Sequence, residues 1–269
     1  MATRTNRSLK HEYGLFIEQE IENYKESIPR TAILTIGDEA AARLAGEQQF
    51  ALTELLLCEE VDKIISGRLR LPSYNTWRKK RLKAHRELRR PEHWGLSADD
   101  ALVRTIHTPE LGAASHVLIA GEGAARSALF LAANGCEVTT LDSELETVQR
   151  VMEAAVQAGL SDRLHAVPAD LGQWTPEGPL HAVVCSHSAL DALSPRERAR
   201  VIAVLQSITM DGGVHLVETI VAGSGAIDEL RATYRGWQVS VEPVRGGVGG
   251  HDMQVFLARK DEGGGHVSH

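Results

Sequence analysis

The sequence has few aromatic residues, few cysteines and no long apolar run. Aromatic residues make up 4% of its 269 residues, and the cysteines are Cys58, Cys136 and Cys185. Their odd number and spacing fit neither a disulfide framework nor a zinc site, so we expect reduced thiols and no bound metal. No segment approaches the roughly 20 apolar residues of a membrane-spanning helix, and no apolar stretch of a signal peptide follows Met1–Arg7. We therefore expect a cytoplasmic protein.

The chain also lacks an excess of basic residues, and its formal net charge is −7. Lysine and arginine number 18 against 16 acidic residues in 1–105, and 11 against 20 in 106–269. Nucleic-acid binding needs a positive surface, so the acidic second part makes a nucleic-acid partner unlikely. The exception is Arg68–Lys83, where Tyr74 and Trp77 alternate with cations. Such a stretch suits single-stranded nucleic acid, but a solvated helix face explains it as well.

The N-terminal part has the periodicity of helices. Residues 12–66 carry apolar side chains near helical spacing and show no alternation of period two. The second helical region is expected over Asp38–Gly67, with Asp38 as the N-terminal cap and Gly67 at the end of the helix. We predict that residues 1–105 form an all-helical region that either caps an active site or pairs two chains in a homodimer.

From about residue 116 the pattern changes to short apolar runs separated by amphipathic helices, which predicts βαβ units and a parallel sheet. The expected strands are Val117–Ala120, Glu137–Leu141, Leu164–Val167, Ala182–Ser186, Val214–Thr219, Gln238–Val241 and Met253–Ala258. The expected helices are Arg126–Asn134, Glu144–Ala158, Pro195–Thr209 and Ala226–Tyr234. Gly246–Gly250 suits a hairpin-like connection, and residues 261–269 are expected to be a disordered tail.

The first expected strand ends in a turn that contains Gly121 and Gly123. Glycine lets the backbone turn sharply and approach a ligand, and the helix that follows offers free N–H groups. On its own this turn is weak evidence, because many strand-to-helix turns use glycine only for packing. The dinucleotide pattern needs a third glycine where Arg126 stands, which disfavours NAD.

Two further strands end in aspartates. Asp142 lies about 20 residues after the first glycine, the spacing of an acid that binds ribose hydroxyls, although it could instead cap the next helix. Asp170 follows the third strand and can accept a hydrogen bond from an adenine amino group, while the Leu171 amide meets a ring nitrogen. A solvated loop is the alternative for Asp170. Open α/β sheets bind ligands at this edge.

Residues 117–260 resemble the class I S-adenosylmethionine-dependent methyltransferases of the tellurite-resistance type. The residues that carry the resemblance are Gly121, Gly123, Arg126–Ala132, Gly135–Asp142, Leu164, His165, Asp170, Leu171, Asp211–Gly213 and Phe256–Lys260. The resemblance implies an α/β fold, a seven-stranded, mostly parallel Rossmann-like sheet whose last strand runs antiparallel. It also implies a cofactor-binding domain over 106–260. Family members usually have an acidic residue at the position of Ile119.

The resemblance implies S-adenosylmethionine as the cofactor. The cofactor-binding residues it predicts are Gly121, Glu122, Gly123, Ala125, Asp142, Ser143, Asp170, Leu171 and Ser186. His187 follows the fourth strand, where the resemblance places the methyl group, and is interpreted either as a base or orienting group or as a packed histidine. Tyr13, Tyr74 and Trp77 are candidate substrate-binding residues from the N-terminal region.

The implied function is methyl transfer to a small-molecule nucleophile by direct displacement, which needs alignment and exclusion of water but no metal. Two alternatives stay open. One is a non-catalytic S-adenosylmethionine-binding or nucleic-acid-associated module that works through the basic helical region. The other is an NAD(P)-dependent oxidoreductase, which Arg126 and the terminal hairpin disfavour.

Overall fold

A computed structural model describes residues 8–45, 54–106, 114–244 and 252–261. The chain divides into two compact units, residues 1–84 and 85–269, which we call unit 1 and unit 2 and describe separately. This boundary lies before residue 105, the predicted end of the helical region, because two short elements that precede residue 107 join the core of unit 2. These are η1 (Pro91–Trp94), whose Trp94 packs against that core, and α5 (Ala101–Ile106), whose Leu102 and Val103 are buried in it.

The regular secondary structure in the described residues of unit 1 is all α-helical. Its helices are α1 (Leu9–Ser27), α2 (Arg30–Ala45), α3 (Glu54–Leu69) and the first part of α4 (Tyr74–Leu88). Its small core consists of Ile21, Ile36, Ala40, Ile64 and Ile65. The helix ends predicted at Asp38 and Gly67 are wrong: Asp38 lies within α2, and Gly67 lies within α3 with open space around its Cα.

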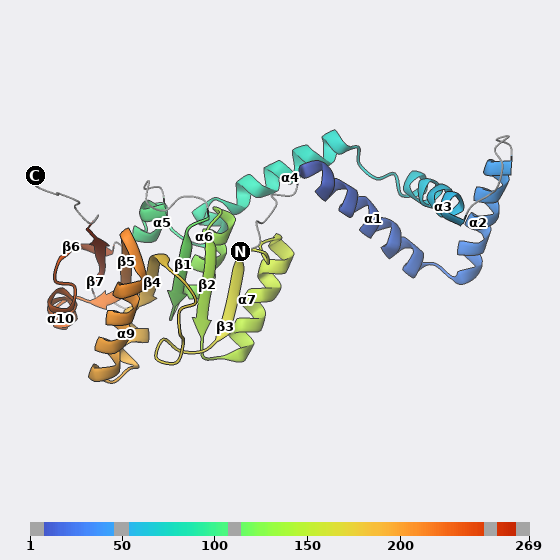
Figure 1. Cartoon of the computed structure of the whole chain (residues 1–269). Helices are drawn as coiled ribbons and strands as arrows, with labels where there is room; N and C mark the ends of the chain where they lie inside the picture. The colour runs from blue at the N-terminus through green and yellow to red at the C-terminus, as the bar shows by residue number, and fades with distance from the viewer. Residues whose placement is uncertain (1–7, 46–53, 107–113, 245–251, 262–269) are drawn as a thin grey trace, which may run out of the picture. The chain divides into compact units, whose positions relative to one another are not determined.

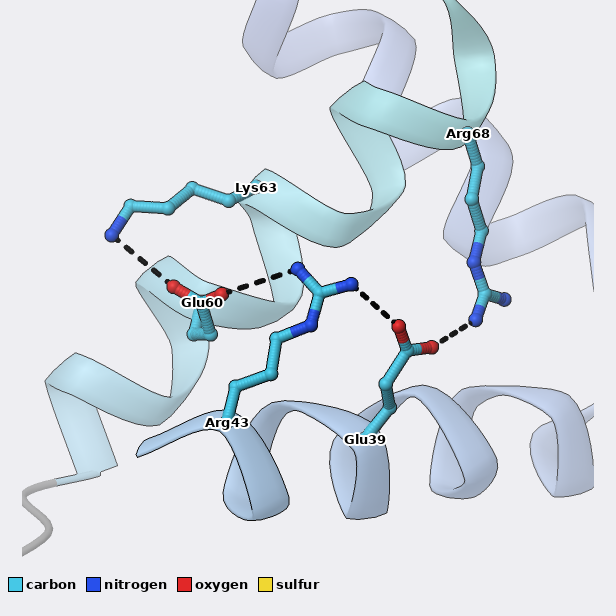
Figure 2. Close-up of polar contacts among 5 residues, drawn as sticks. All are labelled: Glu39, Arg43, Glu60, Lys63 and Arg68. Carbon is cyan, nitrogen blue, oxygen red and sulfur yellow. Dashed lines mark hydrogen bonds and ion pairs between the residues drawn. The ribbon is translucent and has the colours of Figure 1, made fainter. Parts of the chain in front are cut away.

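Ion pairs join α2 to α3 (Figure 2). Arg43 of α2 contacts Glu39 at 2.6 Å and Glu60 of α3 at 3.5 Å, while Arg68 of α3 pairs with the other oxygen of Glu39. Hydrogen bonds from Arg68 and then Arg43 hold the pKa of Glu39 below its ordinary value. Exposed pairs of this kind contribute little to stability, so they help to fix the register of the two helices, and the apolar core supplies most of the packing energy.

Unit 2 contains a seven-stranded sheet in the order β3-β2-β1-β4-β5-β7-β6 (Figure 1). The strands are β1 (His116–Ala120), β2 (Glu137–Asp142), β3 (Leu164–Pro168), β4 (Leu180–Ser186), β5 (Thr209–Val221), β6 (Trp237–Val244) and β7 (Met253–Lys260). Neighbours from β3 to β5 pair parallel, and β7 runs antiparallel to both β5 and β6. The predicted sheet, mostly parallel with an antiparallel last strand, is confirmed.

Helices cover both faces of this sheet. The helices of unit 2 after α5 are α6 (Ala124–Ala133), α7 (Leu145–Ala158), α8 (His187–Asp191), α9 (Pro195–Ile208) and α10 (Ala226–Thr233). One core joins α5, α6 and α7 to the sheet, and a second joins α8, α9 and α10 to the other face. Continuous apolar strands such as β1, with four buried residues in five, are what burial on both faces requires.

The strand order reverses between β1 and β4. From β1 the chain continues outward through β2 and β3, whereas β4 and β5 lie on the other side of β1. Loops at the carboxyl ends of β1 and β4 therefore diverge and leave a crevice, which is where sheets of this topology bind ligands.

Some predicted features lie outside the described residues: the Gly246–Gly250 connection and the tail from residue 262. In the described ranges no helix is both long and apolar enough to cross a membrane.

Candidate cofactor site

A pocket of about 410 Å³ lies at the carboxyl ends of β1, β2 and β3, with α8 on one side. This volume is within the range of small-molecule sites, about 300–1,000 Å³. The predicted cofactor-binding residues that line it are Gly121, Glu122, Gly123, Ala125, Asp142, Ser143, Asp170 and Leu171. The structure thus brings together three turns that are separated in sequence.

The turn after β1 requires glycine. Gly121 has φ of +96°, and a Cβ on it would lie 2.1 Å from the Oγ of Ser186 and 2.9 Å from the Cβ of Ala189. Gly123, with φ of +80°, precedes the first residue of α6. Only glycine adopts such conformations without strain. Gly121 therefore allows this turn to lie close to the end of β4.

Ser186 braces this turn and is not among the residues that line the pocket. Its side chain is buried, and its Oγ accepts a hydrogen bond from the Glu122 N–H at 3.1 Å. The same oxygen caps α8 by accepting from the Ala189 N–H at 3.4 Å. The structure therefore gives Ser186 a positioning role, which the sequence analysis missed.

Both predicted aspartates accept local backbone hydrogen bonds, and their role toward a cofactor stays a prediction. Oδ1 of Asp142 accepts from the Glu144 N–H at 2.8 Å in the turn before α7, whose N-cap is Glu144 rather than Asp142. Oδ1 of Asp170 accepts from the amides of Gly172 and Gln173 at 2.8 and 3.0 Å. Both residues line the pocket, and within the described residues these bonds engage only the Oδ1 atom of each carboxylate.

His187 is the first residue of α8 and does not line the pocket. Its Nδ1 lies 3.1 Å from Oδ2 of Asp191, whose other oxygen pairs with Arg198 at 3.1 Å. The side chain of His187 is 15% exposed. The carboxylate orients the ring and leaves Nε2 for another partner, so both interpretations of His187 remain open.

The three predicted substrate-binding residues form one aromatic cluster in unit 1. The ring centroid of Tyr13 lies 5.4 Å from that of Tyr74 and 5.4 Å from that of Trp77. The Tyr13 hydroxyl donates to the Pro72 carbonyl at 2.8 Å. These contacts account for the cluster as packing within unit 1, and its role toward a substrate stays a prediction.

Raised pKa values occur in unit 2 at Glu218 near the carboxyl end of β5, at Cys185 in β4 and at Cys136 before the amino end of β2, all buried or partly buried. Burial raises the pKa of Glu218, at the end of β5, to about 7; Asp100 acts in the same direction and Arg126 in the opposite one. Sequence analysis did not select Glu218, although an acid at the end of a strand was the signal that found Asp142. Burial raises the pKa of Cys185 to about 12 and that of Cys136 to about 11, so neither is a reactive thiol at neutral pH.

No cluster suited to a metal ion occurs within the described part of the chain. The ligand chemistry of the pocket is that of a nucleoside: carboxylates at two strand ends and a glycine turn at the third.

Residues 117–213 match a family described as a methyltransferase domain. No curated protein is similar in sequence to this chain. Among solved structures, TehB from Haemophilus influenzae is similar with a TM-score of 0.50 and 16% identity, over 63% of this chain and 65% of TehB. The N-methyltransferase NodS from Bradyrhizobium japonicum WM9 has a TM-score of 0.47 and 14% identity, over 62% of this chain and all of NodS.

The similarity to TehB shows a common fold. The match over residues 117–213 adds the class of enzyme, a methyltransferase, and S-adenosylmethionine is the cofactor predicted for that class. The enzyme class and cofactor predicted from the sequence are thereby supported. That the chain belongs to the tellurite-resistance type of methyltransferase stays a prediction.

Proposed function

We propose that this chain transfers the methyl group of S-adenosylmethionine to a small-molecule nucleophile by direct displacement. The observation that carries the proposal is the pocket itself, in which the glycine turn, Asp142 and Asp170 follow one another along the ends of β1, β2 and β3. The methionine end, the ribose and the adenine of the cofactor would meet the glycine turn, Asp142 and Asp170 in this order. When bound, the cofactor supplies a methyl group activated by a positive sulfur.

The residues of the chain hold and orient the reactants. Asp142 would accept hydrogen bonds from the ribose hydroxyls, Asp170 would accept from the adenine amino group, and the Leu171 amide would meet a ring nitrogen. The Gly121–Gly123 turn lets the backbone approach the methionine end without a side chain in between. Alignment of this kind accounts for much of the rate of a two-reactant displacement.

His187 is the proposed base or orienting group for the nucleophile. Its ring is held by Asp191 through Nδ1, which presents Nε2 as the proton acceptor. The candidate substrate residues Tyr13, Tyr74 and Trp77 belong to the same proposal, as does a homodimer formed through the helices of unit 1.

The first prediction concerns Asp142. Asp142→Ala is expected to weaken binding of S-adenosylhomocysteine by about tenfold to a hundredfold, because hydrogen bonds that involve a charged group contribute roughly 1.5–3 kcal/mol. Isothermal titration calorimetry measures this directly. Glu153→Ala, an exposed carboxylate on α7, is the matched control and should bind as the wild type does.

The same titration tests the proposed function. The wild type should bind S-adenosylmethionine and S-adenosylhomocysteine and should not bind NAD. Binding of NAD with no response to either sulfur compound would support the oxidoreductase instead and would refute the proposal.

The second prediction concerns His187. His187→Ala is expected to lower turnover about 100-fold, the lower end of what general acid–base catalysis contributes, while binding of S-adenosylhomocysteine is retained. Turnover is followed as S-adenosylhomocysteine release with an acceptor found in a panel of small amines, thiols and phenols. Unchanged turnover in this variant would assign His187 to packing.

A further inference from the structure

The guanidinium of Arg126 lies beside the Gly121–Gly123 turn, and both Arg126 and Glu218 lie outside the set of residues that line the pocket. A Cβ built on Gly123 would be 3.7 Å from one terminal nitrogen of Arg126, and a Cβ on Gly95 would be 3.7 Å from the other. Arg126 is in the first turn of α6 and its side chain is exposed. Among the described residues it has no hydrogen-bonded or ion-paired partner, so its charge is available to a ligand.

The carboxylate of Glu218 lies at the same edge, at the end of β5. Glu218 is in register with Ser186, the residue that braces the glycine turn. The pairing of β5 with β7 is interrupted between Val217 and Ile220, and Thr219 has φ of +61°. Bulges of this kind redirect side chains near active sites, and a strained non-glycine residue marks a position that the surrounding structure imposes.

Glu218 faces a small set of titratable and charged groups. These are Asp100, just before α5, Arg126 of α6 and Cys185 of β4. Within the part of the chain that the structure describes, the half-buried Glu218 carboxylate has no hydrogen-bond donor. A carboxylate in this position is poorly solvated, and a cation that paired with it would stabilise its charged form.

We propose that Arg126 and Glu218 bind the amino-acid end of the cofactor, with the Arg126 guanidinium on its carboxylate and the Glu218 carboxylate on its ammonium group. The assignment rests on the proposed function. Along the sheet edge Asp170 and Asp142 occupy the ends of β3 and β2, so the remaining part of the ligand extends over β1 toward β4 and β5. The amino-acid end of the cofactor carries a negative carboxylate and a positive ammonium group. The positive Arg126 side chain complements the first, and the negative Glu218 side chain complements the second.

Two other residues of the β1 strand and turn bear on this assignment. Ile119, which is in register with Val184 of β4, is a buried residue of the sheet core and offers no charge. Glu122 is the competing carboxylate, because it is exposed and lines the pocket. The test therefore compares Glu218 with Glu122.

The experiment is calorimetric titration of the full chain with two probes. S-adenosylhomocysteine contains the amino-acid end, and 5′-methylthioadenosine shares its adenosine and sulfur but lacks that end. The variants are Glu218→Gln, Arg126→Met and Glu122→Gln. Glu153→Gln on α7 and Arg231→Met on α10 are controls that remove the same charges from exposed helical positions.

Glu218→Gln and Arg126→Met are each expected to weaken S-adenosylhomocysteine binding about tenfold or more and to change 5′-methylthioadenosine binding less than twofold. The wild type should also bind S-adenosylhomocysteine more tightly as the pH rises from 6 to 8, since the ammonium pairs with the ionised carboxylate. This pH dependence should be absent in Glu218→Gln.

Several results would overturn the assignment. One is wild-type S-adenosylhomocysteine affinity in Glu218→Gln and Arg126→Met, and another is a loss confined to Glu122→Gln. Loss of both probes in either Glu218→Gln or Arg126→Met would indicate general damage to the pocket and would also count against it. A wild-type chain that binds neither S-adenosylhomocysteine nor S-adenosylmethionine would refute the proposed function itself, which separates that failure from failure of this assignment.

Discussion

Gly121→Ala is expected to abolish measurable S-adenosylhomocysteine binding and to lower the free energy of unfolding of the chain by roughly 2–4 kcal/mol. Alanine is strained at φ of +96°, and its Cβ would lie 2.1 Å from the Oγ of Ser186. Relief of that contact moves the turn away from β4 and breaks the hydrogen bond from the Glu122 N–H to Ser186. The pocket then loses the wall next to the methionine end.

Calorimetry measures the binding, and urea denaturation followed by circular dichroism measures the stability. Gly178→Ala is the matched control, because a Cβ at Gly178 meets no atom within 4 Å and the residue is outside the left-handed region. We expect it to change stability by less than about 0.5 kcal/mol. Wild-type binding in Gly121→Ala would mean that the turn does not approach β4 as described.

Acidification is expected to destabilise unit 2 through His215. This histidine is 1% exposed, and its two ring nitrogens contact the hydroxyls of Thr209 at 2.7 Å and Tyr234 at 2.8 Å. Burial, and then the charge of Lys260, lowers the pKa of His215 from 6.5 to about 3. The neutral ring is therefore part of the fold.

The sign of the effect follows from proton binding. Between pH 6.5 and about 3 the unfolded chain protonates His215 and the folded chain does not, so the free energy of unfolding decreases as the pH falls. At pH 5 the loss should be roughly 2 kcal/mol relative to pH 7.5, since each pKa unit corresponds to about 1.4 kcal/mol.

Urea denaturation at pH 7.5 and pH 5 measures this loss. His215→Gln keeps a polar side chain but does not titrate, so its free energy of unfolding should be lower at pH 7.5 and should change less between the two pH values. The difference between the two proteins isolates His215 from other groups that titrate in this window, such as Glu218. An equal pH dependence in both proteins would contradict the role given to His215.

Much of the fold could be predicted because short apolar runs identify strands that are buried on both faces. Each predicted strand lies within an observed one, with the ends displaced by a few residues. The predicted ends at Asp38 and Gly67 were wrong because both residues occupy exposed positions inside helices. There the preferences of aspartate for caps and of glycine for stops are weak compared with the packing of the helix as a whole.

The location of the pocket could be predicted for a related reason. Carboxyl ends of parallel strands meet at one edge, so Gly121, Asp142 and Asp170 had to come together once the strands were known. The bracing role of Ser186 could not be predicted, because its partner is a backbone amide 64 residues earlier in the chain. The place of Glu218 near the end of a strand could be seen in the sequence, but the irregularity in the pairing of β5 with β7 beside it leaves no pattern there.

A crystal structure of the chain with S-adenosylhomocysteine tests the central claim most directly. We predict the adenine beside Asp170 and Leu171, the ribose hydroxyls within hydrogen-bonding distance of Asp142, and the sulfur next to the Gly121–Gly123 turn. A ligand bound elsewhere on the chain, or one whose ribose does not contact Asp142, would contradict the account.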